Sequence, residues 1–275
     1  MQKQLLFLTI LFAGCSLSVL GQSHAAMSMS HSDSTMVMSD SVQMIHPIES
    51  SRPLRSERPA ITPKGYFQME HEFKIEDTDP GFIYSYPSSV WKVGVTNNFE
   101  FRVITEYITV QKEPNPDING FLPLGVGIKA KLGEQKGILP KISFVGDLTL
   151  PGVVGDEFET TYLAPDVRLA FEHKVSKLFE VGYNLGLKWD GINAEPDFTY
   201  SLYTDFNITN HLGLYVEGYG TTPQRDDVDM EVRIDAGLSY LIGNDFLVFA
   251  SAGKGLTDAA VESFVSGGFS YRFKL

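Results

Sequence analysis

The chain has 275 residues, of which 43% are hydrophobic and 20% charged, so it is long and apolar enough for one large folded domain. It carries 22 Lys and Arg residues against 34 Asp and Glu residues, which gives a net charge of -12. This balance argues against nucleic acid as a partner, because phosphate binding needs a concentrated basic surface.

The first residues predict an export signal. Lys3 precedes the apolar run LLFLTILFAG, which has the length of a signal-peptide core. Small residues follow, and we expect cleavage after Gly21, with Ala25 as the alternative. The single cysteine, Cys15, lies in FAGC, a loose lipoprotein box that offers a third reading. We therefore assign residues 1–21 to a signal peptide and expect an exported protein.

Residues 22–64 predict a disordered leader followed by a linker. Residues 22–50 are rich in Ser and Met and lack periodicity, and SRPLRSERPAITPKG is polar and interrupted by prolines. Methionine and histidine side chains suit soft metals, but their irregular spacing here gives no defined metal site. The folded part is expected to begin near Gly65.

From Gly65 onward, alternation with a period of two dominates and predicts β-strands. In YFQMEHEFKI, one face carries Phe67, Met69, His71, Phe73 and Ile75, and the other carries polar residues. The same alternation recurs in FEFRVITEY, PDVRLAFEH, FEVGYNLGLKW, VRIDAGLSY and FVSGGFSYRFKL. Because no segment has a helical period, we predict an all-β fold.

Short turns alternate with longer polar loops. The short turns contain TNN, GEQKG, SK, TNH and GND, whereas the longer loops contain EDTDPGF, QKEPNPDING, PGVVGDEFET, DGINAEPD, TTPQRDDVD and LTDAAVES. This asymmetry and an even strand number are typical of outer-membrane barrels. We predict a closed antiparallel up-and-down transmembrane β-barrel of about twelve strands over residues 65–275.

Alternation alone does not say which face is outside, and a soluble secreted β-protein would show the same period. Three features favour an apolar face toward lipid: mixed charges on the polar face, aromatic residues near strand ends, and a chain that stops in mid-strand. We therefore assign charged residues to the lumen or its constriction, namely Glu100, Arg102, Lys129, Asp147, Asp166, Arg168, Glu180, Asp205, Glu217, Arg233 and Asp235. The constriction itself is expected where Arg102, Arg168 and Arg233 face Glu100, Asp166 and Asp235.

Motifs for catalysis are missing from the sequence. It has no G-x-S-x-G elbow, no Walker loop and no H-E-x-x-H. His71 and His173 fall on the apolar face, and no serine lies two residues from either, as a lipid-facing hydrolase of this kind would need. Carboxylates such as Glu70 and Glu72 have basic neighbours, which favours a lattice of charge pairs. We predict a protein that is not an enzyme, with no catalytic residues, no metal and no cofactor.

Several stretches recur in a familiar order, among them SERPAITPKGYFQMEHEF, WKVGVTNNFEFRV, VGYNLGLKWDG, DAGLSYLIGNDFLVFASAGKGL and GGFSYRF. Through these stretches, residues 57–273 resemble the outer-membrane family known as MetA-pathway of phenol degradation. The chain departs from the pattern by adding KL after YRF, where such chains commonly end on the aromatic residue. The resemblance implies an outer-membrane barrel with a transport role and offers no catalytic residues.

These observations lead to two functional hypotheses. The first is a passive channel for small solutes, aromatic or hydrophobic ones included, in the outer membrane of a Gram-negative bacterium. The alternative is a plugged structural or adhesive barrel that acts through its extracellular loops. The expected partners are outer-membrane lipid, a small-molecule solute and, during assembly, the barrel-insertion machinery.

Overall fold

The computed structural model describes residues 46–78, 80–111, 114–152, 156–225 and 228–275. The predicted signal peptide and residues 22–45 of the predicted leader lie outside these ranges. Within them, no helix is long and apolar enough to cross a membrane. The regular structure consists of strands and one 3-10 turn, η1 (Asp156–Phe158).

The described residues form thirteen strands, which together make the barrel wall. Most have alternating sequences of the kind that suits a two-faced sheet. Their bounds are β1 (Tyr66–Asp77), β2 (Phe82–Thr96), β3 (Phe99–Gln111), β4 (Ile118–Phe121), β5 (Gly125–Gly133), β6 (Lys141–Thr149), β7 (Ala164–Lys174), β8 (Phe179–Lys188), β9 (Asp197–Asn207), β10 (Leu212–Pro223), β11 (Glu231–Ile242), β12 (Phe246–Gly255) and β13 (Ser263–Lys274).

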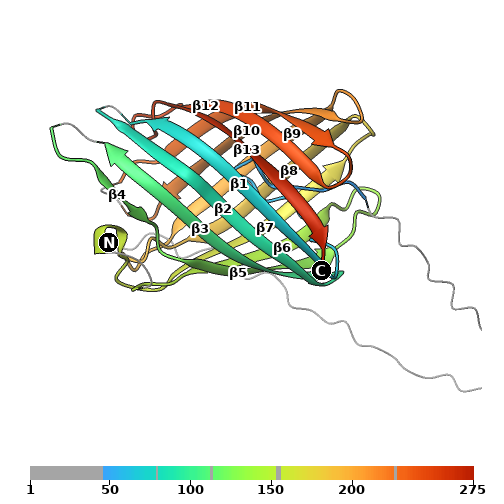
Figure 1. The fold of residues 1–275 in the computed structure, drawn as a ribbon, viewed down its shortest axis with the longest axis horizontal. Helices are drawn as coiled ribbons and strands as arrows, with labels where there is room; N and C mark the ends of the chain where they lie inside the picture. Colours follow the sequence, from blue (N-terminus) through green and yellow to red (C-terminus); the bar gives the residue numbers. More distant parts are fainter. Residues whose placement is uncertain (1–45, 79, 112–113, 153–155, 226–227) are drawn as a thin grey trace, which may run out of the picture. The chain divides into compact units, whose positions relative to one another are not determined.

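Neighbouring strands pair in antiparallel fashion around the barrel, and the last strand closes on the first (Figure 1). β1 pairs with β13 from Tyr66↔Lys274 to Asp77↔Ser263, while its other edge pairs with β2. β4 and β5 both pair with β3, one after the other, so they act as a single interrupted strand. The barrel therefore has twelve strand positions, which confirms the predicted fold class.

The two ends of the barrel differ. The end at which β1 starts and β13 stops carries short connections, such as residues 97–98 and 243–245, and we call it the turn end. The opposite end, the loop end, carries longer ones, such as residues 150–163 and 256–262. Most connections are short at the turn end and longer at the loop end, as predicted, and the exceptions are residues 134–140 at the turn end and 78–81 at the loop end.

Side chains alternate across the wall, and the polar face points inward. On β1, Glu70 is 1% exposed and Glu72 0%, whereas Phe73 is 48% exposed. Large apolar side chains on other strands are exposed in the same way, including Phe101, Leu185, Leu238 and Val265. A soluble β-protein would bury this apolar face, so the wall instead suits a surrounding of hydrocarbon.

One polar pair on the outer face escaped the sequence search. The Nδ1 atom of His71 on β1 lies 2.8 Å from the hydroxyl of Ser89 on β2, and both side chains are buried. The rings of Trp91 and Phe269 lie 4.8 and 5.1 Å from the His71 ring. The serine comes from the neighbouring strand, so a search along one strand misses it. The lipid-facing surface tolerates this histidine because its Nδ1 atom has a hydrogen-bond partner and its ring contacts aromatic rings.

Candidate functional site

Residues 46–64 lie inside the barrel, and we call them the inner segment. At the turn end, Arg272 donates to the carbonyl of His46 at 2.8 Å. The segment returns to the same end, where the amide of Gly65 donates to the carbonyl of Gly94 at 2.9 Å. A Cβ added to Gly94 would lie 2.0 Å from the Pro63 carbonyl oxygen, so a glycine is needed at this close approach. This arrangement differs from the linker predicted up to residue 64.

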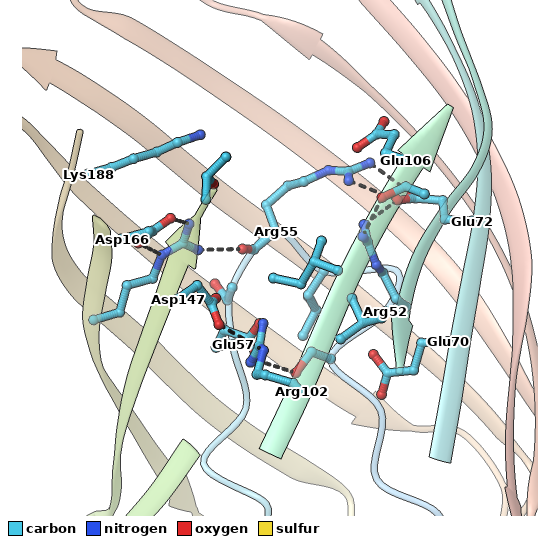
Figure 2. Close-up of a pocket in the computed structure, with 18 of the residues that line it drawn as sticks. Arg52, Arg55, Glu57, Glu70, Glu72, Arg102, Glu106, Asp147, Asp166 and Lys188 are labelled. Carbon is cyan, nitrogen blue, oxygen red and sulfur yellow. Dashed lines mark hydrogen bonds and ion pairs between the residues drawn. The ribbon is translucent and has the colours of Figure 1, made fainter. Parts of the chain in front are cut away.

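Residues 52–58 form the tip of the inner segment, and two arginines of this tip bind one carboxylate. The guanidinium of Arg55 donates to both oxygens of Glu72, at 2.9 and 2.8 Å, and Arg52 donates to the same group (Figure 2). Arg52 also donates to Ser88 at 2.9 Å. Glu72 is fully buried, and such a group is tolerated only when charge-assisted hydrogen bonds offset its desolvation.

A second wall carboxylate binds the backbone of the tip. Glu217 on β10 accepts hydrogen bonds from the amides of Arg55 and Ser56, both at 2.7 Å, and from the Ser56 hydroxyl. Asp235 on β11 lies directly opposite Glu217 in the strand pairing and is also buried. Glu217 therefore satisfies backbone groups that a non-regular segment would otherwise leave unpaired away from water.

The single acidic residue at the tip faces wall cations. Glu57 binds Arg102 at 2.6 Å and Lys129 at 2.8 Å, and its amide donates to Asn184 at 2.6 Å. Burial raises the pKa of Glu57, but the charges of Arg102 and Lys129 outweigh that effect and hold the pKa well below its ordinary value. Glu57 is therefore ionised at neutral pH.

Arg58 lies among three carboxylates on the turn side of the tip. It donates to Asp205 at 2.6 Å and lies 3.5 Å from Glu172 and 4.0 Å from Glu180. Its guanidinium carbon is 5.2 Å from the centre of the Tyr203 ring, and the Tyr203 hydroxyl donates to Glu172 at 2.9 Å. The group is thus recognised by charge, by hydrogen bonds and by an aromatic face.

Leu54 forms the apolar centre of the site. It is 3% exposed and clusters with Tyr203 and Tyr215. A Cβ on Gly182 or Gly237 would lie 2.1 and 2.4 Å from these two rings, so glycines on the inner wall make room for the tyrosines. This cluster gives the tip an apolar contact with the wall, in addition to its ionic contacts.

The inner segment lies between two cavities. The loop-side cavity has a volume of about 340 Å³, and its walls include Glu106, Asp166 and Lys188 near the loop end. The turn-side cavity has a volume of about 320 Å³, and its walls include Asn207 and His211 near the turn end. Arg52 and Leu54 line both cavities, so the tip stands between them.

The predicted lumen residues fall into three groups. Seven contact the inner segment directly: Glu100, Arg102, Lys129, Arg168, Glu180, Asp205 and Glu217. Two contact it through a neighbour, since Asp147 lies 3.1 Å from Arg102 and Asp166 lies 2.5 Å from Arg168. The remaining two are Asp235, opposite Glu217, and Arg233, whose ion pairs are with Glu76 and Glu231.

Sequence reasoning missed the other half of the site. The inner segment supplies Arg52, Arg55, Glu57 and Arg58, which the sequence pattern assigns to a polar linker interrupted by prolines. A signal was available, because arginine recurs at every third residue in RPLRSERP, between prolines that prevent a strand. Three arginines at this spacing precede a barrel with many inward carboxylates. This pattern could have predicted that the segment binds inside the lumen.

Comparison with solved structures shows the fold. The chain is similar to the COG4313 outer membrane channel from Pseudomonas putida F1, with a TM-score of 0.64 and 11% identity, over 78% of this chain and 97% of that one. It is also similar to the KdgM porin in complex with disordered oligogalacturonate, with a TM-score of 0.51 and 11% identity, over 76% and 99% of the two chains.

No curated protein matches the chain. A family model does match, over residues 52–273, and so includes both the barrel wall and the inner segment from Arg52 onward. The chain therefore belongs to the family described as "Putative MetA-pathway of phenol degradation".

Proposed function

We propose that the protein is a channel in the outer membrane of a Gram-negative bacterium, through which small solutes, aromatic or hydrophobic ones included, move passively. The observation that carries this proposal is a closed barrel whose charged interior holds a cavity on each side of the inner segment. The likeness in fold to proteins named as an outer membrane channel and a porin supports it.

The inner segment sets the width of the path. Its tip is fixed by Glu72, Glu217 and the Leu54 cluster, so water and ions have only the space beside it. A narrow, charge-lined path selects solutes by charge and size. We therefore expect low conductance from the intact chain and a wide path when the segment is absent.

Purified protein in planar bilayers tests this proposal. The intact chain is compared with a variant that lacks residues 48–60, and both sides of this deletion lie toward the turn end, since Ile48 binds Asn244 and Thr62 binds Glu100. We expect small conductance steps from the intact chain and much larger steps from the deletion variant. Migration of unheated samples on a gel verifies that the variant forms a barrel. A folded deletion variant that passes neither ions nor small solutes would exclude channel function.

The filled lumen also supports the second hypothesis, a structural or adhesive barrel acting through its loops. On that hypothesis, deletion of residues 112–118 at the loop end abolishes partner binding and leaves any flux unchanged. Flux through the deletion variant of the inner segment, combined with no effect of the loop deletion on cell adhesion, favours the channel.

A further inference from the structure

We propose that the channel favours organic cations, with an ammonium or guanidinium group, and that the arginines of the inner segment occupy the sites those cations use. This inference rests on the proposed function and names its substrate class. Three of the four charged side chains at the tip are arginines, and each binds a wall carboxylate. The arginines of the tip thus indicate that the inner wall binds cationic groups.

The wall carboxylates around the tip depend on the inner segment for their charge partners. Within the described residues, Glu72 forms ion pairs only with Arg52 and Arg55. In the part of the chain that the structure describes, Asp205 and Glu172 form ion pairs only with Arg58. When the segment moves away, these three buried or half-buried acids are left without a counterion, and a passing cation is the group that relieves them.

The wall cations around the tip do not depend on the inner segment in the same way. Arg102 binds Glu57 of the segment but also lies 3.1 Å from Asp147 of the wall. Lys129 binds Glu57 but also lies 3.8 Å from Glu100 of the wall. Withdrawal of the segment therefore leaves Arg102 and Lys129 paired with wall acids, whereas the three acids named above lose their ion pairs, so the vacated lumen attracts cations.

Aromatic rings complete the two acid sites. The guanidinium carbon of Arg55 lies 5.3 Å from the centre of the Phe264 ring, and that of Arg58 lies 5.2 Å from the centre of the Tyr203 ring. A carboxylate beside an aromatic face is a general arrangement for binding organic cations, because the face of the ring is electron-rich. Simple charge balance within the lumen would not require these rings.

Both acid sites are reachable from a cavity. Glu72 lines the loop-side cavity together with Glu106, which accepts a hydrogen bond from Ser85 at 2.6 Å and has no ion pair among the described residues. Glu172, Glu180 and Asp205 line the turn-side cavity. An organic cation can therefore pass from Glu106 to Glu72 and then to the Asp205 site by taking the place of one arginine after another.

Two measurements test the inference. In planar bilayers under a salt gradient, the reversal potential of the variant lacking residues 48–60 should show preference for K⁺ over Cl⁻. In liposomes, flux should rank 2-phenylethylamine above 2-phenylethanol and phenylacetate, which are similar in size and differ in charge. The expected preference for the amine over phenylacetate is about fivefold or more.

A point variant tests the same inference if the deletion variant fails to fold. Arg58→Gln frees Asp205 and Glu172 in an otherwise intact chain, so selectivity should move toward cations, while Lys136→Gln, in a turn outside the lumen, should change nothing. Equal or greater flux of phenylacetate through a conducting variant would overturn this inference and leave the channel proposal standing. Absence of all flux through the folded deletion variant would overturn both.

Discussion

The barrel wall and the inner segment are held in place by different interactions. The wall is fixed by backbone ladders, such as the twelve residue pairs that join β1 to β13, and these do not depend on side-chain identity. The tip of the inner segment is fixed by side chains, since Glu217 and Asn184 bind its amides. Side-chain substitutions should therefore displace the inner segment easily. They should disrupt the wall only when they remove a backbone hydrogen bond.

The largest effect is expected from breaking a backbone ladder. Val265→Pro on β13 removes an amide from the strand that closes the barrel on β1, and a ladder group left unsatisfied in the membrane costs several kcal/mol. We expect this variant to lose the gel mobility of an unheated barrel. Val265→Ala retains the amide and should migrate like the parent. If Val265→Pro forms a stable barrel, closure depends less on the ladder than we infer.

The next effect separates the inner segment from the wall. Glu72→Gln removes the shared counterion of Arg52 and Arg55, and an uncompensated buried charge costs about 3 kcal/mol. We expect the segment to leave its site, which raises conductance and exposes its arginines to trypsin, while the barrel stays folded. Glu76→Gln on the same face is the matched control. Continued protection of Arg55 in Glu72→Gln would contradict the assigned anchor.

A smaller effect on conductance should follow from disrupting the Leu54 cluster, because the ionic contacts of the tip remain. Leu54→Ala removes most of a buried side chain between the two cavities, which costs about 2–5 kcal/mol if the site cannot collapse. We expect a wider path and higher single-channel conductance with the ionic contacts intact. Leu54→Met, of similar volume, should conduct like the parent. Unchanged conductance in Leu54→Ala would mean that the path does not pass this residue.

The smallest effect concerns pH. The pKa of Glu57 is lowered in the folded protein, so its contribution is fully present above the ordinary value near ~4.3 and is lost as the pH falls toward the lowered one. The part of the inner segment's protease protection that Glu57 supplies should therefore be constant from neutral pH down to about 5. Glu57→Gln should reduce protection equally across that range. A decline in the parent protein between pH 7 and 5 would show that another group controls docking.

The sequence was sufficient for the wall but not for the inner segment, for a physical reason. Alternation along β1 or β8 is a local pattern, and strand pairing follows from chain order in an up-and-down barrel. The contacts of the segment have no such locality, because Ser56 reaches Glu217 161 residues away and Glu57 reaches Asn184 127 residues away. The lumen residues could be named as inward-facing, but their shared partner could not.

Arg233 illustrates the same limit within the wall. The alternation predicts that Arg233 faces inward, and its grouping with Arg102 and Arg168 rests on charge alone. Depth along the barrel axis decides which inward residues meet, and Arg233 meets Glu76 and Glu231 rather than the inner segment. Register between strands, which the sequence pattern leaves open, is what fixes this depth.

The inner segment begins at His46 and ends before Tyr66 at one and the same mouth of the barrel. It is therefore a folded-back loop rather than a thread pulled through a ring. The barrel can therefore close between β1 and β13 before the inner segment enters the lumen. The segment can also leave through the turn end without breaking that pairing. In this topological sense, barrel closure and entry of the segment are independent steps.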